Sequence, residues 1–244
     1  MFKLTDKVAI VTGATSGIGK AVARAYVKMG AKVALVARDT IKLTDTEKEL
    51  GESVFAVSCD VTEEASVTSM VALVLKKWGR IDVAVCNAGI VSLAKLSDMP
   101  LEEFERIQKT NVTGVFLVAR SCAKVMKPGS SIITTASMSG HVVNTPQDIG
   151  HYCTSKGAVL MLTKALAVEL APRNIRVNSI SPGYIMTELV EPLTDYHAIW
   201  KPRIPLGRLG KPDELTGLFV YLASDASGYM TGSDLIIDGG YTAI

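Results

Sequence analysis

The sequence predicts a doubly wound α/β fold, in which helices cover both faces of a parallel sheet of about seven strands. Short runs rich in β-branched residues alternate with longer amphipathic runs along all 244 residues. The short runs are almost continuously apolar, as expected of parallel strands that are buried on both faces. Because no proline- or serine-rich linker, charge block or internal repeat divides the chain, we expect one domain spanning residues 1–244.

The expected elements follow each other in strand–helix order. Each strand is a run such as KVAIV or KVALV, and each helix fills the gap to the next strand. Gly30 and Gly79 stand where the first and third helices should end, which is the usual place of a C-terminal cap. The expected strands are 7–11, 32–36, 54–58, 81–85, 131–136, 175–180 and 234–238, and the expected helices are 17–29, 40–50, 63–78, 102–126, 152–171 and 212–223.

Composition and charge narrow the classes of function. Hydrophobic residues make up 48% of the chain, charged residues 20%, and the net charge is +2, so neither a nucleic acid nor an acidic membrane is an expected partner. The longest apolar stretches, such as 8–11 and 33–37, are too short to cross a bilayer, and the N-terminus lacks the apolar core of a signal peptide. The cysteines form no C-x-x-C pair, which favours reduced thiols in a cytoplasmic protein without a metal site. They are Cys59, Cys86, Cys122 and Cys153.

The segment TGATSGIG, residues 12–19, links the first expected strand to the first expected helix. Gly13, Gly17 and Gly19 allow a tight turn that brings the amino end of the helix close to a bound group. Free N–H groups and the helix dipole at that end stabilise a pyrophosphate. The spacing differs from the common G-x-G-x-x-G fingerprint, and a simple chain reversal is the alternative. The position between strand and helix favours a nucleotide phosphate.

Residues VARD, 36–39, follow the second expected strand. An acidic side chain at this place holds the ribose 2′-hydroxyl of NAD, whereas an arginine accommodates the 2′-phosphate of NADP. The strand-end residue is Ala37 and the next is Arg38, so NADP(H) is expected in preference to NAD(H). The alternative for Arg38 is a solvated loop charge; Asp39 follows it, and Ser16 in the glycine loop adds no second cation.

Polar residues also follow the remaining strands. Asp60 suits the adenine amino group, or else it caps the next helix, for which Thr62 is the rival. Asn87, in CNAG, stands where a dinucleotide should cross the sheet, or it satisfies backbone groups of a turn. Ser137 suits a substrate carbonyl oxygen and Thr187 a cofactor amide, with helix capping as the alternative for both.

The stretch HYCTSKG places Tyr152 one helical turn before Lys156. Positions i and i+4 share a helix face and a nearby cation stabilises a phenolate, so we expect Lys156 to lower the pKa of Tyr152 from its usual value of about 10. Such a tyrosine serves as a general acid and base, and a chance surface pair is the alternative. Asn111 lies inside an expected helix, where a polar side chain that interrupts the helix ladder can hold a water; a surface position is its alternative.

All of these residues stand at the carboxyl ends of expected strands or on the helices beside them. The carboxyl ends of parallel strands meet at one edge of the sheet, which is where such folds bind ligands. One cleft should therefore collect them, and this coincidence favours the catalytic interpretation of Tyr152 and Lys156.

The motifs TGATSGIG, CDVT, CNAG and TNVTG, followed by Ser137, Tyr152-x-x-x-Lys156 and SPGYIMT, occur in this order over essentially the whole chain. In this order they resemble the short-chain dehydrogenase/reductase family, in its form of about this chain's length. The resemblance implies a Rossmann-type fold and an oxidoreductase acting on CH–OH groups. The motif that departs from the family is CNAG, where Cys86 replaces the first asparagine of the more usual NNAG, which puts only the local turn bonding in question.

The resemblance also implies a role for each residue. Tyr152 would be the acid and base, Ser137 the partner of the carbonyl or alkoxide oxygen, and Lys156 the cation that also bonds the nicotinamide ribose. Asn111 would hold a water in a proton relay to Lys156. The family usually forms tetramers through helices like 102–126 and 152–171, so a homotetramer is expected. The expected contacts of NADP(H) are Gly13, Thr15, Ser16, Gly17, Ile18, Gly19, Arg38, Asp60, Val61, Asn87, Ala88, Gly89, Tyr152, Lys156, Pro182, Gly183, Ile185 and Thr187.

Two segments should select the substrate. One is 138–151, and the other is 188–206, which we expect to be a lid that carries Tyr196 and Trp200. The first segment contains His141, Asn144, Gln147 and His151, and polar groups over an open cleft suit a hydroxylated substrate, unless they belong to a solvated loop. The expected substrate contacts are Ser137, Ser139, Asn144, His151, Tyr152 and Tyr184.

The C-terminal half looks most like NADP(H)-dependent ketose and polyol reductases, such as mannitol dehydrogenases and sorbose reductases. This resemblance implies hydride transfer between NADP(H) and the carbonyl or secondary alcohol of a ketose, a polyol or a related hydroxyketone. The close alternatives are a 3-oxoacyl-carrier-protein reductase, for which Arg120, Lys124 and Lys127 would supply the basic patch, and a broad-specificity carbonyl reductase. The distant alternative is a non-catalytic NADP-binding sensor.

Overall fold

Seven parallel strands form one sheet in the computed structural model, which describes residues 2–244. Their order across the sheet is β3-β2-β1-β4-β5-β6-β7, so β1 lies between β2 and β4. Every neighbouring pair is parallel. The strands are β1 (Val8–Thr12), β2 (Lys32–Ala37), β3 (Val54–Ser58), β4 (Val83–Cys86), β5 (Ser131–Thr135), β6 (Arg176–Pro182) and β7 (Asp234–Ile237).

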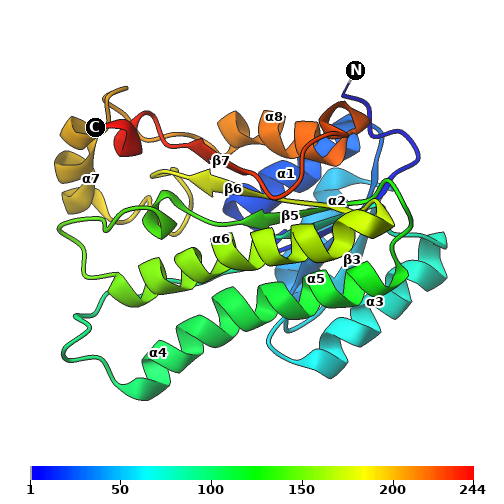
Figure 1. Ribbon diagram of the computed structural model, residues 1–244, viewed down its shortest axis with the longest axis horizontal. Coiled ribbons are helices and arrows are strands. Elements are labelled where there is room, and N and C mark those ends of the chain that lie inside the picture. The colour runs from blue at the N-terminus through cyan, green and yellow to red at the C-terminus, as the bar shows by residue number, and fades with distance from the viewer. Residues whose placement is uncertain (1) are drawn as a thin grey trace.

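Helices cover both faces of this sheet, as Figure 1 shows. One face is covered by α1 (Gly17–Lys28), α2 (Thr40–Leu50) and α8 (Pro212–Ala223). The other face is covered by α3 (Glu64–Trp78), α5 (Gly114–Val125) and α6 (Gly150–Leu170). Two shorter helices, α4 (Leu101–Gln108) and α7 (Thr194–Trp200), lie at the end of the molecule where the strands finish (Figure 1).

The core consists of two apolar layers, one on each face of the sheet. Along β2, Ala34 and Val36 belong to the layer under α3, α5 and α6, whereas Val33 and Leu35 belong to the layer under α1 and α8. Successive side chains of a strand point to opposite faces, so a strand between two layers must be apolar throughout. The expected doubly wound, single-domain fold is confirmed.

The strands begin and end within two residues of their expected positions. Helix α3 ends at Gly79, which adopts the left-handed conformation expected of a C-terminal cap. The expected helix 102–126 is helical from Leu101 to Val125, but a π-helical turn over Lys109–Thr113, which was not expected, joins α4 to α5. The helix α7 was not expected, because its seven residues lie in a segment that sequence patterns identify only as an insert.

The described part of the chain, residues 2–244, has no helix long and apolar enough to cross a membrane. It also has no group of three His, Cys, Asp or Glu residues placed to hold a metal ion. All four cysteines are free thiols, and burial raises the pKa of each. We therefore regard them as packing residues.

Candidate active site

Two cavities lie at the carboxyl ends of the strands. The first has a volume of about 230 Å³ and the second about 280 Å³. They meet at Gly89 and Ile90, which line both. These two residues follow β4, the strand that pairs with β1 on the side opposite β2. The order of the strands reverses at this point, because β2 and β3 lie on one side of β1 and β4 to β7 lie on the other, and doubly wound folds bind their ligands at such a point.

The turn between β1 and α1 contributes to both cavities, because Gly13 and Thr15 line the second and Ile18 lines the first. A Cβ atom on Gly19 would lie 2.1 Å from the Gly13 carbonyl oxygen, so only glycine allows α1 to start so close to the turn. The N-cap residue Ser16 makes no side-chain capping hydrogen bond, and the Gly17 N–H donates to the carboxylate of Glu188 at 2.9 Å. An acidic side chain therefore already lies at this helix end, which favours the phosphate interpretation over a simple chain reversal.

The structure divides the expected cofactor contacts between the two cavities. The first cavity is lined by Ile18, Asn87, Gly89, Tyr152, Lys156, Pro182, Gly183, Ile185 and Thr187. The second cavity is lined by Gly13, Thr15, Arg38, Asp60, Val61, Ala88 and Gly89. Three expected contacts line neither cavity, because they form the first turn of α1: Ser16, Gly17 and Gly19.

The second cavity is cationic at the end of β2. Both Arg38 and Lys42 line it. The carboxylate of Asp39 accepts hydrogen bonds from the N–H groups of Ile41 and Lys42, each at 3.0 Å, and so caps α2. Lys42 was not expected from the sequence, because it lies in the first turn of α2 and does not directly follow the strand. The Lys42 side chain is the second cation that the glycine loop does not supply.

Asp60 lies on the opposite wall of the second cavity. Its carboxylate accepts hydrogen bonds from the Thr62 N–H at 2.9 Å and the Thr62 hydroxyl at 2.8 Å, and it lies 4.0 Å from the Arg38 guanidinium. Burial raises the pKa of Asp60, but the Thr62 bonds and the charges of Arg38 and Lys109 outweigh burial and leave the pKa below its usual value. Helix α3 has Glu63 as its N-cap, so neither Asp60 nor Thr62 occupies the capping position.

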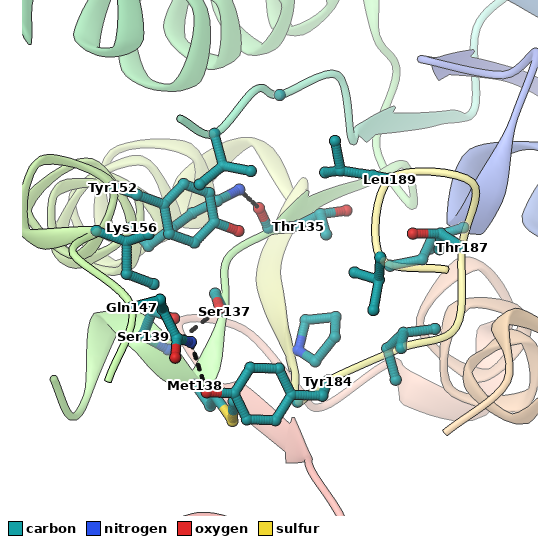
Figure 2. A pocket seen from close by; sticks show the side chains of 18 of the residues that line it. Thr135, Ser137, Met138, Ser139, Gln147, Tyr152, Lys156, Tyr184, Thr187 and Leu189 are labelled. Atoms are coloured by element: carbon teal, nitrogen blue, oxygen red, sulfur yellow. Dashed lines mark hydrogen bonds between the residues drawn. The ribbon is translucent and has the colours of Figure 1, made fainter. Parts of the chain in front are cut away.

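Three of the four expected catalytic side chains meet in the wall of the first cavity, as Figure 2 shows: Ser137, Tyr152 and Lys156. Tyr152 and Lys156 project from the same face of α6, and the Lys156 Nζ atom lies 5.4 Å from the centre of the tyrosine ring. The ammonium donates a hydrogen bond of 2.8 Å to the Thr135 carbonyl at the end of β5. Ser137 follows the same strand. Its hydroxyl lies close enough to the phenol to form a hydrogen bond that partly lowers the pKa of Tyr152.

The expected lowering of the tyrosine pKa by Lys156 is wrong. Burial raises the pKa of Tyr152 to about 12, and the Ser137 hydroxyl offsets this only in part. Burial also lowers the pKa of Lys156 to about 8. A buried ammonium loses its hydration and is weakened as a cation, and here it is directed at a carbonyl oxygen. The shared helix face was predicted correctly, but its effect on acidity was not.

Asn111 is fully buried in the π-helical turn, so its surface alternative is wrong. Its side-chain oxygen accepts the Ile90 N–H at 2.8 Å. Its amide donates to the Ile90 carbonyl at 2.9 Å and to the Ser155 hydroxyl at 3.0 Å. The side chain thus fastens the loop after β4 to α6. A Cβ atom on Gly89 would lie 3.2 Å from the Asn111 oxygen and 3.7 Å from Lys156 Nζ, so these three residues adjoin one another.

Two of the expected substrate contacts are not in the cavity wall. His151 is fully buried and its ring Nε2 lies 3.1 Å from the Ser92 hydroxyl. Successive helix residues point in different directions, so Tyr152 facing the cavity turns His151 away from it. Asn144 is also buried, and its amide lies 3.4 Å from the Tyr184 hydroxyl. Ser139 and Tyr184 do line the cavity.

The segment 188–206 forms one wall of the first cavity. Trp200 is buried and stacks on Tyr184, with ring centres 4.1 Å apart and planes at 11°. Gln147 contacts both rings and lines the cavity, but the sequence analysis named it only as one polar residue of its segment. The side chains that this segment adds to the cavity are mainly apolar: Leu189, Val190, Leu193, Tyr196 and Trp200.

The basic residues considered for a carrier-protein patch do not face the cavities. Arg120 forms an ion pair with Glu64 and lies 4.8 Å over the Phe116 ring. Lys124 is in the last turn of α5, and Lys127 follows that helix just before β5 begins. The cavities lie at the carboxyl ends of the strands, so the amino ends are at the opposite end of the sheet. These two lysines therefore lie near the amino ends of the strands, at the opposite end of the sheet from Tyr152.

Comparison with known proteins supports this geometry. A family model described as enoyl-(acyl carrier protein) reductase matches residues 13–242. The NADP-dependent mannitol dehydrogenase of Alternaria alternata is 40% identical over 252 residues, which cover 99% of this chain and 94% of that protein. Sorbose reductase sou1 of Schizosaccharomyces pombe is 39% identical, with 99% and 98% covered.

A further relative differs in its coenzyme. The NAD-dependent glycerol dehydrogenase of Listeria innocua is 38% identical over 247 residues, which cover 99% of this chain and 96% of that protein. Among solved structures, a short-chain type dehydrogenase/reductase from Mycobacterium marinum is 58% identical, with a TM-score of 0.97 and with 100% of this chain and 98% of that chain covered. These similarities extend over the whole sheet and both cavities.

Proposed function

The chain belongs to the short-chain dehydrogenase/reductase family and is an oxidoreductase acting on CH–OH groups, and from this premise we propose that it interconverts a ketose and a polyol, or a related hydroxyketone and its alcohol, with NADP(H). The observation that carries the proposal is the convergence of Ser137, Tyr152 and Lys156 on one cavity wall. That cavity adjoins the second cavity at Gly89 and Ile90, so a dinucleotide lying across this junction reaches both.

In the proposed reaction NADPH supplies the hydride to the carbonyl carbon. Tyr152 donates its phenolic proton to the carbonyl oxygen, and the Ser137 hydroxyl bonds the same oxygen. With a pKa of about 12, Tyr152 holds its proton at neutral pH and is ready to act as the acid. In the reverse direction the deprotonated tyrosine would remove the alcohol proton, and the hydride would pass from the alcohol carbon to bound NADP⁺. We assign Lys156 to the nicotinamide ribose and Asn111 to holding the loop after β4.

We propose NADP(H) as the coenzyme because Arg38 and Lys42 line the second cavity while Asp39 is engaged in capping α2. Removing both cations, in the variant Arg38→Ala/Lys42→Ala, should lower the ratio of kcat/KM for NADPH to that for NADH by about a hundredfold, since a charge-assisted contact contributes about tenfold or more. The matched control is Lys48→Ala, at the far end of α2, and should leave the ratio unchanged. An unchanged ratio in the double variant would reject the assignment.

The substrate proposal is tested by NADPH turnover with fructose, sorbose and an acetoacetyl thioester, measured side by side. Reduction of a sugar supports the ketose assignment, and reduction of the thioester alone would replace it with carrier-protein reduction. The sensor alternative predicts NADPH binding without turnover of any carbonyl. The position of Lys124 and Lys127 at the opposite end of the sheet favours the sugar over the carrier protein.

Assembly and location complete the proposal. We propose a homotetramer, supported by an exposed apolar face on α6 that contains Met161 and Val168. We also propose a cytoplasmic location, supported by four free cysteines.

A further inference from the structure

Gln147 is held in one orientation in the wall of the first cavity. Its side-chain oxygen accepts the indole N–H of Trp200 at 2.9 Å, and its amide donates to the Tyr184 hydroxyl at 2.6 Å. An indole N–H can only donate, so the oxygen of the amide must face Trp200 and the nitrogen must face Tyr184. Since Trp200 is itself stacked on Tyr184, all three side chains fix one another.

This orientation leaves Gln147 with unused hydrogen-bonding capacity. A primary amide carries two N–H donors, and its oxygen accepts two bonds. Trp200 and Tyr184 use one acceptor position and one donor. The other donor and the other acceptor position stay free on a residue that is only 6% exposed and lines the cavity. A buried amide with free positions discriminates strongly for a ligand that can use them.

Ser139 adds a hydroxyl at the same place. Its backbone N–H donates to the Ser137 hydroxyl oxygen at 3.1 Å, so it lies directly beside the residue assigned to the substrate carbonyl. The Ser139 hydroxyl lines the cavity and makes no hydrogen bond to any residue from 2 to 244. Figure 2 shows Ser139 and Gln147 together on the Ser137 side, with Leu189 across the cavity.

We propose that Ser139 and Gln147 form a subsite that binds a hydroxyl group on the carbon next to the substrate carbonyl. Oxygens on adjacent carbons lie close enough for Ser137 to bond one while the Ser139–Gln147 pair bonds the other. Across the cavity the wall includes the apolar Val91, Leu93 and Leu189, and its polar Thr187 is among the expected contacts of the cofactor. The required substrate is thus an α-hydroxyketone. This inference rests on the proposed carbonyl reduction and specifies its substrate.

The test compares hydroxyacetone with butanone, in which a methyl group replaces the hydroxyl, as substrates for NADPH-dependent reduction. Wild type should favour hydroxyacetone in kcat/KM by about a hundredfold. The variant Gln147→Met keeps the length of the side chain but removes its polar atoms. It should lower kcat/KM for hydroxyacetone by about tenfold or more and leave the value for butanone within about twofold.

Trp200→Phe removes the indole N–H that fixes the amide of Gln147 and keeps an aromatic ring on Tyr184. If Gln147 acts on the substrate, this variant lowers the preference for hydroxyacetone, but by less than Gln147→Met does. Equal losses on both substrates in Gln147→Met and in Trp200→Phe would make Gln147 an anchor of the lid and overturn the subsite. NADPH binding, measured by fluorescence, reports whether each variant is folded.

If Gln147→Met does not bind NADPH, Ser139→Ala decides instead. This variant should reduce the preference for hydroxyacetone several-fold, and an unchanged preference would overturn the subsite. A wild type that reduces both ketones equally well refutes the subsite and leaves the proposed function standing. A wild type that reduces neither ketone but reduces fructose or sorbose also refutes the subsite, and one that reduces none of the four compounds refutes the proposed function.

Discussion

At neutral pH the buried phenol of Tyr152 is protonated. Burial lowers the pKa of Lys156, so its ammonium loses its proton at a lower pH than an exposed lysine does. Their pKa values of about 12 and about 8 are both set by burial, not by attraction between the two groups. An acid that keeps its proton suits the reductive direction. Oxidation should therefore speed up as the pH rises above neutrality, while reduction holds its rate.

Replacing Tyr152 with phenylalanine removes the proposed proton donor and little volume. We expect kcat for ketone reduction to fall by about a thousandfold, since positioned acid catalysis contributes on that order. The dissociation constant for NADPH should stay within about twofold, because the cavity keeps its shape. Tyr229→Phe, at a fully exposed tyrosine, is the control and should keep full activity. Tyr152→Phe with more than a tenth of wild-type kcat would exclude the assigned role.

Lys156→Met tests the lowered amine pKa through stability. An unfolded lysine has a pKa near 10.5, whereas Lys156 has about 8 in the folded chain, so between these values the unfolded chain binds the extra proton. Stability from this group therefore rises with pH across that window, by about 1 kcal/mol per pH unit.

The measurement is urea unfolding of wild type and Lys156→Met at several pH values between about 8 and 9.5. The free energy of unfolding of wild type minus that of the variant should increase with pH. The cysteines, whose raised pKa values act in the opposite direction above pH 9, are common to both proteins and cancel in the difference. A difference that is flat across the window contradicts the lowered pKa.

Site residues that follow a strand, or that form a spaced pair on one helix, were predictable, and residues whose position depends on the path of a helix or loop were not. Ser137 and Asn87 could be named from sequence because a parallel sheet brings the carboxyl ends of its strands to one edge. Lys42 and Gln147 were not singled out, since their contribution depends on how a helix and a loop turn in three dimensions. His151 was wrongly assigned for the same reason: it adjoins Tyr152 in sequence but points away from it.

Among the elements, the interrupted helix α4–α5 has the clearest functional meaning. The helical periodicity of the sequence supported a helix over 102–126. That periodicity does not reveal a π-helical turn, which inserts one extra residue into a single turn of the helix. The π-helical turn widens the backbone at Asn111 and directs that side chain toward Ile90. Two elements far apart in sequence, the loop after β4 and α6, are joined by it.

Asn111→Ala should lower the free energy of unfolding by about 2–3 kcal/mol, because it leaves the partly buried N–H and carbonyl groups of Ile90 without their partner and removes a hydrogen bond to the Ser155 hydroxyl. Urea denaturation measures this. The control is Thr110→Ala in the same turn, which loses one exposed hydrogen bond to the Arg106 carbonyl and should cost about 0.5 kcal/mol or less. Equal costs for the two variants would show that the Asn111 contacts do not hold the loop.

The insert 188–206 lines the first cavity, and its role as a substrate lid stays a prediction, whereas its helix α7 could not be predicted. Seven residues are too few to show a helical period, and Trp200 fixes α7 by contacts with Tyr184 and Gln147. Such contacts join segments separated by many residues, so no local pattern reveals them.

On the scale of the whole molecule, the proposed active site lies at the carboxyl ends of the strands, and the outer face of helix α6 is exposed. Met161 and Val168 lie seven positions apart on α6 and are 63% and 78% exposed, although the opposite face of this helix is in the core. Positions seven apart share a face, so these two side chains belong to one apolar stripe. A stripe of this kind is typical of a contact between subunits.

The double variant Met161→Glu/Val168→Glu should break the proposed tetramer. Multi-angle light scattering should give four times the 26.0 kDa of one chain for wild type and half of that mass or less for the variant. Val143→Glu, at an equally exposed valine outside the helices, is the control and should keep the wild-type mass. A monomeric wild type, or a double variant of unchanged mass, would reject α6 as an interface.

The two cavities share only Gly89 and Ile90 among their lining residues from 2 to 244. Selection can therefore revise the choice of coenzyme and the choice of substrate in separate steps, through different segments of the chain. An evolved variant can change its coenzyme from NADP to NAD and keep its substrate, or change its substrate and keep its coenzyme. This independence gives a physical reason why so similar a scaffold serves glycerol with NAD in one relative and mannitol with NADP in another.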